Sequence, residues 1–173
     1  DDAEMKDEAG KSVAVHEAQF AASAHKKLDC VGCHTAALGV KHKGKRQPLG
    51  PVSFDVCMEC HEDEITPFQN SVHARIKGGK PGTCVGCHGN VHTFVRSNNP
   101  AAAMAPLNQV RNCGVCHEDM MEGYLSSVHA KSLFVSGLTD AAPSCSDCHG
   151  SHDIQRHDAA GARTSHKTSP ETC

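Results

Sequence analysis

The sequence predicts a mainly α-helical fold with extensive loops and little or no β-structure. Three observations favour this class: a Cys-x-x-Cys-His pentapeptide occurs five times in 173 residues, stretches between its copies have helical composition, and aromatic residues make up only 3%. A chain this poor in large apolar side chains is weakly placed to offset its conformational entropy by protein packing alone. Its 15 Gly and 8 Pro residues suit loops.

The pentapeptide has the pattern of an attachment site for c-type haem. Two thiols separated by two residues face one porphyrin edge and can form thioethers to its vinyl groups, and the His that follows is carried under the iron as the proximal ligand. The ten cysteines are Cys30, Cys33, Cys57, Cys60, Cys84, Cys87, Cys113, Cys116, Cys145 and Cys148, and the proximal histidines are His34, His61, His88, His117 and His149.

The fivefold repetition of the pentapeptide favours haem attachment over a zinc site or a thioredoxin-like redox motif. A zinc site also uses Cys-x-x-Cys pairs, but it needs no His directly after every second Cys. A thioredoxin-like redox motif occurs once, near a βαβ pattern, and no such pattern is visible. We therefore expect five covalently bound haems that form the core, with short helices wrapped around them. The chain without haem should be largely unfolded, because a cofactor bound only by the native state stabilises that state.

Taken in order, the chain divides into four predicted parts. Residues 1–50 form an N-terminal segment with haem 1, in which a short amphipathic helix is plausible over residues 13–27. Residues 51–105 form a two-haem module with haems 2 and 3, and residues 106–155 repeat it with haems 4 and 5. Residues 156–173 form a tail.

Two further repeats supply candidate distal ligands. An aromatic-x-x-Ser-x-His pattern precedes three of the pentapeptides, and an extra His trails two of them. A trailing His is poorly placed for its own iron, because one helical turn cannot pass round the macrocycle, so it should reach a neighbouring haem. The candidates are His25, His73 and His129 from the first repeat, His92 and His152 from the second, and His16 and His42 as additional possibilities. Spacing does not say which distal His serves which haem.

The eleventh cysteine, Cys173, has no partner in a pentapeptide. The residues before it are similar to the approach to another Cys-x-x-Cys-His, so one interpretation is that it begins a sixth motif. The other is an ordinary terminal or intermolecular thiol.

Composition limits the partners and the location. The formal net charge is −3, with no basic domain and no aromatic stacking platform, which argues against nucleic acid. No apolar run approaches the ~18 residues of a membrane span. Asp1-Asp2 is typical of a processed N-terminus whose signal peptide has been removed. Haem c is attached outside the bacterial membrane, so we expect a periplasmic or extracellular protein.

With these motifs in view, residues 20–155 resemble multihaem c-type cytochromes of the cytochrome c3 and NapC–NrfH-like type. The segment from Ser127 to Ile154 is similar to repeats in large bacterial electron-transfer cytochromes. The resemblance implies electron transfer along closely packed, mostly bis-His haems. It also implies redox partners such as a membrane quinol dehydrogenase, other cytochromes or a terminal reductase.

Three functions stay open on the sequence. An electron carrier with all-His ligation and low reduction potentials comes first, because distal candidates suffice for every haem. A multihaem reductase or oxidase would need one open catalytic haem, and no Cys-x-x-Cys-Lys variant is present. A subunit of a larger complex or filament is compatible with the first.

Overall fold

The computed structural model describes residues 6, 10, 12, 14–38, 52–75 and 83–172. Over these ranges the helices are short, loops connect them, and no strand forms apart from an isolated bridge between Lys6 and Ser12. The predicted fold class is therefore confirmed. No helix in the same ranges is long and apolar enough to cross a membrane. His42 and Cys173 lie outside the described residues.

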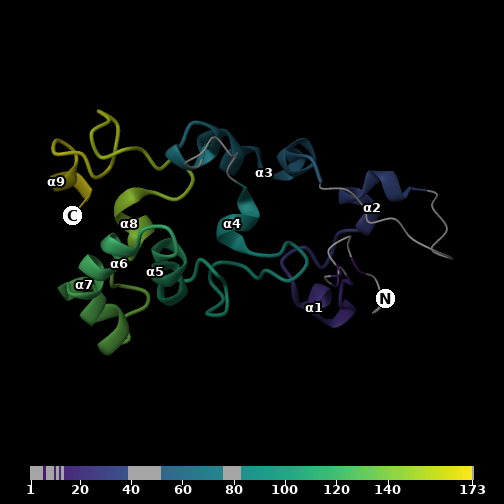
Figure 1. Cartoon of the computed structure of the whole chain (residues 1–173), viewed down its shortest axis with the longest axis horizontal. Helices are drawn as coiled ribbons and strands as arrows, with labels where there is room; N and C mark the ends of the chain where they lie inside the picture. Colours follow the sequence, from purple (N-terminus) through teal and green to yellow (C-terminus); the bar gives the residue numbers. More distant parts are fainter. Residues whose placement is uncertain are drawn as a thin grey trace. The chain divides into compact units, whose positions relative to one another are not determined.

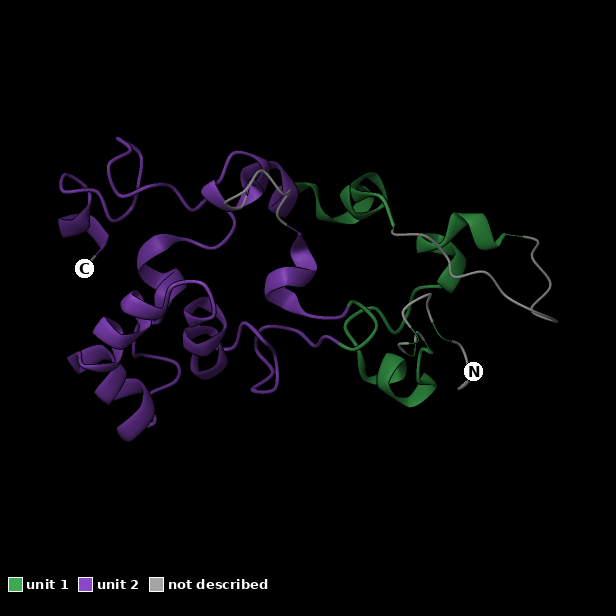
Figure 2. Cartoon of the chain, viewed as in Figure 1, with its two compact units in different colours: residues 1–62, 91–93 green, residues 63–90, 94–173 purple. Residues whose placement is uncertain are grey.

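The chain separates into two compact units (Figure 2). Unit 1 comprises residues 1–62 and 91–93, and unit 2 comprises residues 63–90 and 94–173. The four predicted parts, with boundaries at residues 50, 105 and 155, stay a prediction.

Unit 1 contains α1 (Glu17–Ala22), α2 (Cys30–Cys33), the 3₁₀ turn η1 (Thr35–Ala37) and the first part of α3 (Phe54–Gln69). The helix expected over residues 13–27 forms only at α1, which ends at Ser23 in extended conformation. Short helices are marginal by themselves, and the N-cap His16 makes no side-chain capping bond. Such a helix needs packing to hold it.

Unit 2 contains the remaining elements, drawn from teal to yellow in Figure 1. Helix α5 begins with Pro106, whose missing N–H has no intrahelical partner to lose at this position. It contacts α6, α8 and η3. After residues 63–69 of α3, the elements in order are η2 (Val72–Ala74), α4 (Cys84–His88), α5 (Pro106–Gly114), α6 (Glu118–Leu125), α7 (Val128–Ala130), the π-helical turn η3 (Lys131–Val135), α8 (Cys145–His149) and α9 (Ser169–Thr172).

The apolar core of unit 2 is small. Its buried members are Val110, Leu133 and Ala142, with Met121 and Tyr124 packed against them. Among the described side chains of large volume, Leu133 alone is fully buried. Burying each of these side chains stabilises the folded state by about 1.5–3 kcal/mol. The total is small beside the conformational entropy that the chain loses on folding.

Candidate haem sites

In four pentapeptides both cysteines lie on a helix, and in the fourth Cys113 lies on α5 while Cys116 lies in the turn that follows it. Helices α2, α4 and α8 begin at the first Cys of their motif, whereas α3 and α5 begin several residues before it. Residues three apart on a helix lie on one face, so both sulfurs are presented together. None of these ten cysteines forms a disulfide in the part of the chain that the structure describes. No three His, Cys, Asp or Glu side chains of the described ranges converge as a cluster for a metal ion.

The backbone at the last four motif histidines takes two forms. At His61 and His117 the chain leaves helical geometry (φ −121°, ψ 33° and φ −120°, ψ 55°) and then enters a new helical stretch. His88 instead ends α4 and is followed by Gly89 at φ 82°, ψ −160°. These values lie in a region that only glycine adopts readily. The glycine redirects the chain after the motif.

The fifth motif repeats the glycine form. His149 ends α8 and Gly150 follows at φ 83°, ψ 177°. A Cβ at Gly150 would also collide with the carboxylate of Asp153. In both copies the glycine carries the next His away from its own motif.

Two pairs of histidine rings face each other in unit 1. The rings of His25 and His61 have centroids 6.0 Å apart and planes inclined by 60°. The rings of His34 and His92 have centroids 5.9 Å apart and planes inclined by 22°. Each pair joins one predicted proximal His to one predicted distal His.

Unit 2 contains two pairs of the same kinds. The rings of His73 and His117 have centroids 6.0 Å apart at 58°. The rings of His88 and His152 have centroids 6.1 Å apart at 25°. The tilted pair and the near-parallel pair of unit 1 thus recur with nearly the same separations and angles.

These separations suit two imidazoles that share one iron. A metal–imidazole bond is about 2.0–2.1 Å and the ring centroid lies roughly 1 Å further, so axial imidazoles on opposite faces have centroids about 6 Å apart. Packed aromatic rings in general span about 4.5–7 Å. The four pairs fall between 5.9 and 6.1 Å, so the residues present fit haem in this respect.

Exposed apolar side chains provide a second test of fit. Val31, Val85 and Val115 stand inside the motifs and are all exposed, Val115 by 80%. Val72 and Val128, beside the Ser-x-His histidines, are exposed as well. Exposed apolar side chains that recur at the same place in several motifs are surface that a bound ligand can cover. A porphyrin attached to the cysteines would cover such surface.

The surroundings of two distal candidates lower their pKa and so favour the neutral imidazole, which is the form that ligates metals. Burial lowers the pKa of His73, and the nearby His117 lowers it further. Burial likewise lowers the pKa of His92, with additional effects from His34 and His25.

Polar side chains of α5 join the three motifs of unit 2. Asn112 Nδ2 donates to the carbonyl of Cys87 at 2.7 Å. The buried Gln109 donates from Nε2 to Ser146 Oγ at 2.9 Å and accepts the Ser146 N–H at its Oε1 at 3.0 Å. A hydrogen bond with Cys113 lowers the pKa of the Cys145 thiol to about 7. The third, fourth and fifth attachment sites are thereby held close together.

Other hydrogen bonds fix the segments that carry His73 and His152. The Val72 N–H donates to the Ile154 carbonyl at 2.9 Å, and Gln155 Nε2 donates to the Asn70 carbonyl at 2.9 Å. Ser71 Oγ accepts the N–H of His73 at 3.2 Å and caps its turn. The Ser of the repeat therefore orients the turn that presents the His.

The remaining candidates lie outside the four ring pairs. His129 lies on α7, which Ser127 caps by accepting the Ala130 N–H at 3.2 Å. His129, His149 and His16 are exposed. Over the described ranges no aromatic ring faces His129 or His149. His42, predicted as a possible distal ligand, lies outside the described residues.

Sequence reasoning missed the parts played by Gln109, Asn112 and the two glycines. Glycine directly after the motif His in two copies was a readable sign of a turn. The two amides carried no comparable sign, because their partners lie 37 and 25 residues away.

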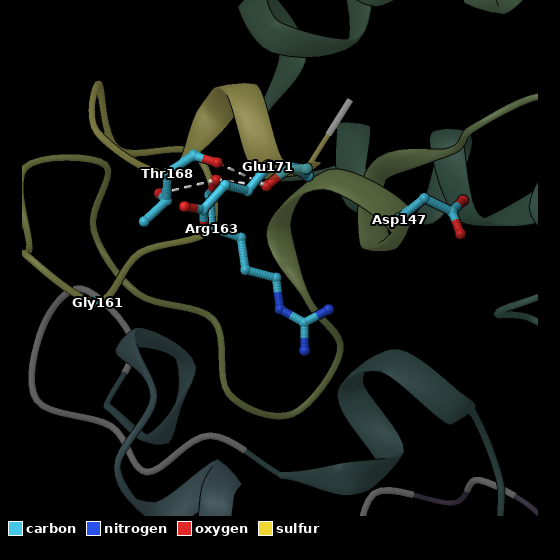
Figure 3. Close-up of a pocket in the computed structure, with 6 residues that line it drawn as sticks. Asp147, Gly161, Arg163, Thr168 and Glu171 are labelled. Atoms are coloured by element: carbon cyan, nitrogen blue, oxygen red, sulfur yellow. Dashed lines mark hydrogen bonds between the residues drawn. The ribbon is translucent and has the colours of Figure 1, made fainter.

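A polar pocket of about 400 Å³ lies beside α8 (Figure 3), lined by Asp147, Gly161, Arg163, Thr168, Glu171 and Thr172. Its groups serve the local structure: Asp147 Oδ2 accepts from the Ser144 N–H at 2.7 Å, and Arg163 pairs with Asp153 at 3.1 Å. The Thr168 and Thr172 hydroxyls donate to loop carbonyls. The pocket lining therefore offers no nucleophile and base aligned for catalysis.

Residues 67–150 match the family model described as cytochrome c7 and related cytochrome c. This finding supports a multihaem c-type cytochrome. The matched part of the chain includes the third, fourth and fifth pentapeptides, and the match implies covalently bound haem c. No curated protein and no solved structure matches the chain. The narrower resemblance to NapC–NrfH-like proteins stays a prediction.

Proposed function

We propose that this cytochrome binds five haem c groups and carries electrons along them between redox partners. The observation that carries the proposal is the set of four His–His pairs with the spacing of axial ligands. Haem c supplies reversible one-electron exchange between Fe(III) and Fe(II) when bound.

Side chains of this protein would bind the haem groups and set their reduction potentials. The ten motif cysteines would fix each haem covalently, and the five motif histidines would ligate from the proximal side. His25, His73, His92 and His152 would occupy the opposite side at four sites, which leaves no room for a substrate there. Because all these ligands are imidazoles, the reduction potentials should be lower than with Met/His ligation.

Close attachment sites support transfer between haems within unit 2. The bonds from Asn112 to Cys87 and from Gln109 to Ser146 tie α5 to the third and fifth motifs. An ordered side-chain network of this kind keeps neighbouring groups at fixed separations. Electron transfer benefits because no large rearrangement accompanies each step.

The proposed partners are redox proteins: a membrane quinol dehydrogenase, other cytochromes or a terminal reductase. The proposed location is the periplasm or the cell exterior, because haem c is attached outside the membrane. Membership of a larger complex or filament is compatible with this role. The alternative, a reductase or oxidase with one catalytic haem, needs acid–base residues beside an open distal face, and the ring pairs favour the carrier.

Intact-mass and redox measurements test the proposal. The mass of the secreted protein should exceed that of the chain by five haems. Spectropotentiometric titration should then show one-electron steps at low potential, and the reduced protein should pass electrons to an oxidised c-type cytochrome. Fewer than five added haems, or steady turnover of nitrite or sulfite as the main activity, would contradict it.

A further inference from the structure

A buried amide on α5 fixes the start of the fifth motif. The side chain of Gln109 is polar, yet the residue is only 4% exposed. Its Oε1 accepts the Ser144 hydroxyl at 2.7 Å and the Ser146 N–H at 3.0 Å, and its Nε2 donates to Ser146 Oγ at 2.9 Å. A buried polar group bonded in this way is held in one arrangement. The residues on either side of Cys145 are therefore tied to a single side chain of α5.

The same helix carries the first cysteine of the fourth motif. Cys113 follows Gln109 by four residues on α5, so the two side chains lie on one face of the helix. Helices α5 and α8 pack against each other (Figure 1). The Cys113 thiol is hydrogen-bonded to the Cys145 thiol, and Cys145 packs against the buried core of unit 2. One sulfur of the fourth motif and one of the fifth thus meet beside that core.

This contact has a consequence once haem is attached. In the holoprotein both sulfurs are thioethers, and each is bonded to a carbon that is itself bonded to the macrocycle. Contact between the sulfurs of Cys113 and Cys145 therefore brings the edges of haems 4 and 5 together. Charges interact more strongly where water is excluded. Reduction of one of these haems should accordingly lower the potential of the other.

The fifth motif is adapted to this amide at one position. The residue after the first Cys offers no hydroxyl in the other four motifs, where it is Val31, Met58, Val85 or Gly114. In the fifth motif it is Ser146, whose hydroxyl can accept the Gln109 amide. Because four motifs lack a hydroxyl at this place, haem attachment does not require one. The hydroxyl of Ser146 therefore serves the contact with α5.

We propose that Gln109 is a positioning residue that holds haems 4 and 5 in contact at their thioether edges and so makes them directly adjacent steps for electrons. Gln109 acts through Ser144 and Ser146, and it contacts neither iron. The proposal deepens the proposed electron transfer and rests on it in requiring haem c at the fourth and fifth motifs.

Nuclear magnetic resonance of the fully reduced holoprotein tests the contact. Carbon monoxide is added so that any haem with an open site is diamagnetic as well. Nuclear Overhauser effects should join the protons of the thioether bridge at Cys113 to those of the bridge at Cys145. Absence of these effects, with both bridges assigned, would overturn the proposal without the need for any variant.

Two variants test the role of the amide. Gln109→Met keeps the length of the side chain and removes its hydrogen bonds. Ser146→Val places at this position the residue that two other motifs carry, so attachment of the haem should persist. In each variant the Overhauser effects should weaken. The interaction potential between haems 4 and 5, measured from haem methyl signals during stepwise reduction, should fall about twofold as water enters.

Asn108→Leu is the matched control on the same helix. Asn108 Nδ2 donates to the carbonyls of Pro100 and Ala102 at 2.8 and 2.9 Å, and neither of these residues belongs to a haem motif. Losing these bonds should destabilise α5 and leave the interaction between haems 4 and 5 unchanged. An equal loss of interaction in Asn108→Leu would reduce Gln109 to a general support of the helix and refute the proposal.

The outcomes also separate this proposal from the proposed function. An unchanged interaction potential in Ser146→Val and in Gln109→Met would refute the positioning role, while five haems and electron exchange with an oxidised c-type cytochrome would persist. Failure of Gln109→Met to fold leaves Ser146→Val as the deciding variant. Fewer than five haems on the wild-type chain would instead count against the proposed function.

Discussion

Single histidines set the properties of each site. The near-parallel pair of His34 and His92 combines a motif His with one whose pKa is lowered by burial. Axial-ligand identity is the strongest means by which a protein sets a haem potential, and a thioether raises that potential relative to imidazole.

We therefore predict that His92→Met raises the reduction potential of one haem and leaves the others nearly unchanged. Spectropotentiometric titration of wild type and variant measures this directly. His16→Met is the matched control, because His16 is exposed at the start of α1 and faces no motif His in the described ranges. Equal shifts in both variants, or none in His92→Met, would exclude His92 as an axial ligand.

At the scale of single residues, the sequence predicted the attachment chemistry and the histidines that pair, but not their partners. The number of residues from a Ser-x-His histidine to the next motif varies, so this spacing does not predict which motif His it pairs with. His34 and His92 stand 58 positions apart (92 − 34), and the contact between them depends on a glycine turn. Such long-range contacts are set by tertiary folding, which the repeats indicate only in outline.

At the scale of elements, two kinds of motif helix present the two kinds of candidate distal His. In the second and fourth motifs the chain bends at the motif His and continues as a helix toward a Ser-x-His turn. In the third and fifth, a glycine at positive φ ends the helix and releases a trailing His. The helical content between motifs was predictable, whereas α1 proved shorter than expected.

Gly89→Ala should destabilise the native protein by about 1–3 kcal/mol, because alanine is strained at φ 82°, ψ −160°. No atom outside the neighbouring residues lies within 4 Å of the added Cβ, so the effect should come from the backbone alone. We also expect looser ligation by His92, seen as partial carbon monoxide binding at the first haem. Chemical denaturation of the holoprotein measures the stability change.

Gly86→Ala is the control for this prediction, since Gly86 lies within α4, where alanine favours the helix. Other motifs carry Glu59 or Val115 at the equivalent position. If Gly86→Ala and Gly89→Ala were equally destabilising, the positive-φ turn would not be the cause.

At the scale of the whole molecule, protein packing is thin and the cofactors should supply the interior. Large apolar side chains such as Val115, Val128 and Val135 are 70% or more exposed. The sequence anticipated this from its scarcity of aromatic residues. It did not anticipate the division into two units, each containing one tilted and one near-parallel histidine pair.

We predict that the chain produced without haem attachment is largely unfolded. Its far-UV circular dichroism should show little helix and no cooperative thermal transition, whereas the holoprotein should show both. A covalently attached haem stays on the unfolded chain, so it stabilises the native state through the apolar burial and axial ligation that only folding provides. A cooperative transition in the haem-free chain would show that the small core around Leu133 suffices.

The most direct test of the central claim is the electron paramagnetic resonance spectrum of the fully oxidised holoprotein. The angle between axial imidazole planes determines the splitting of the iron orbitals, so the four pairs should give two classes of low-spin signal in equal amounts. One class should correspond to planes at 22° and 25°, the other to planes at 60° and 58°. Low-spin signals from fewer than four haems would contradict the account.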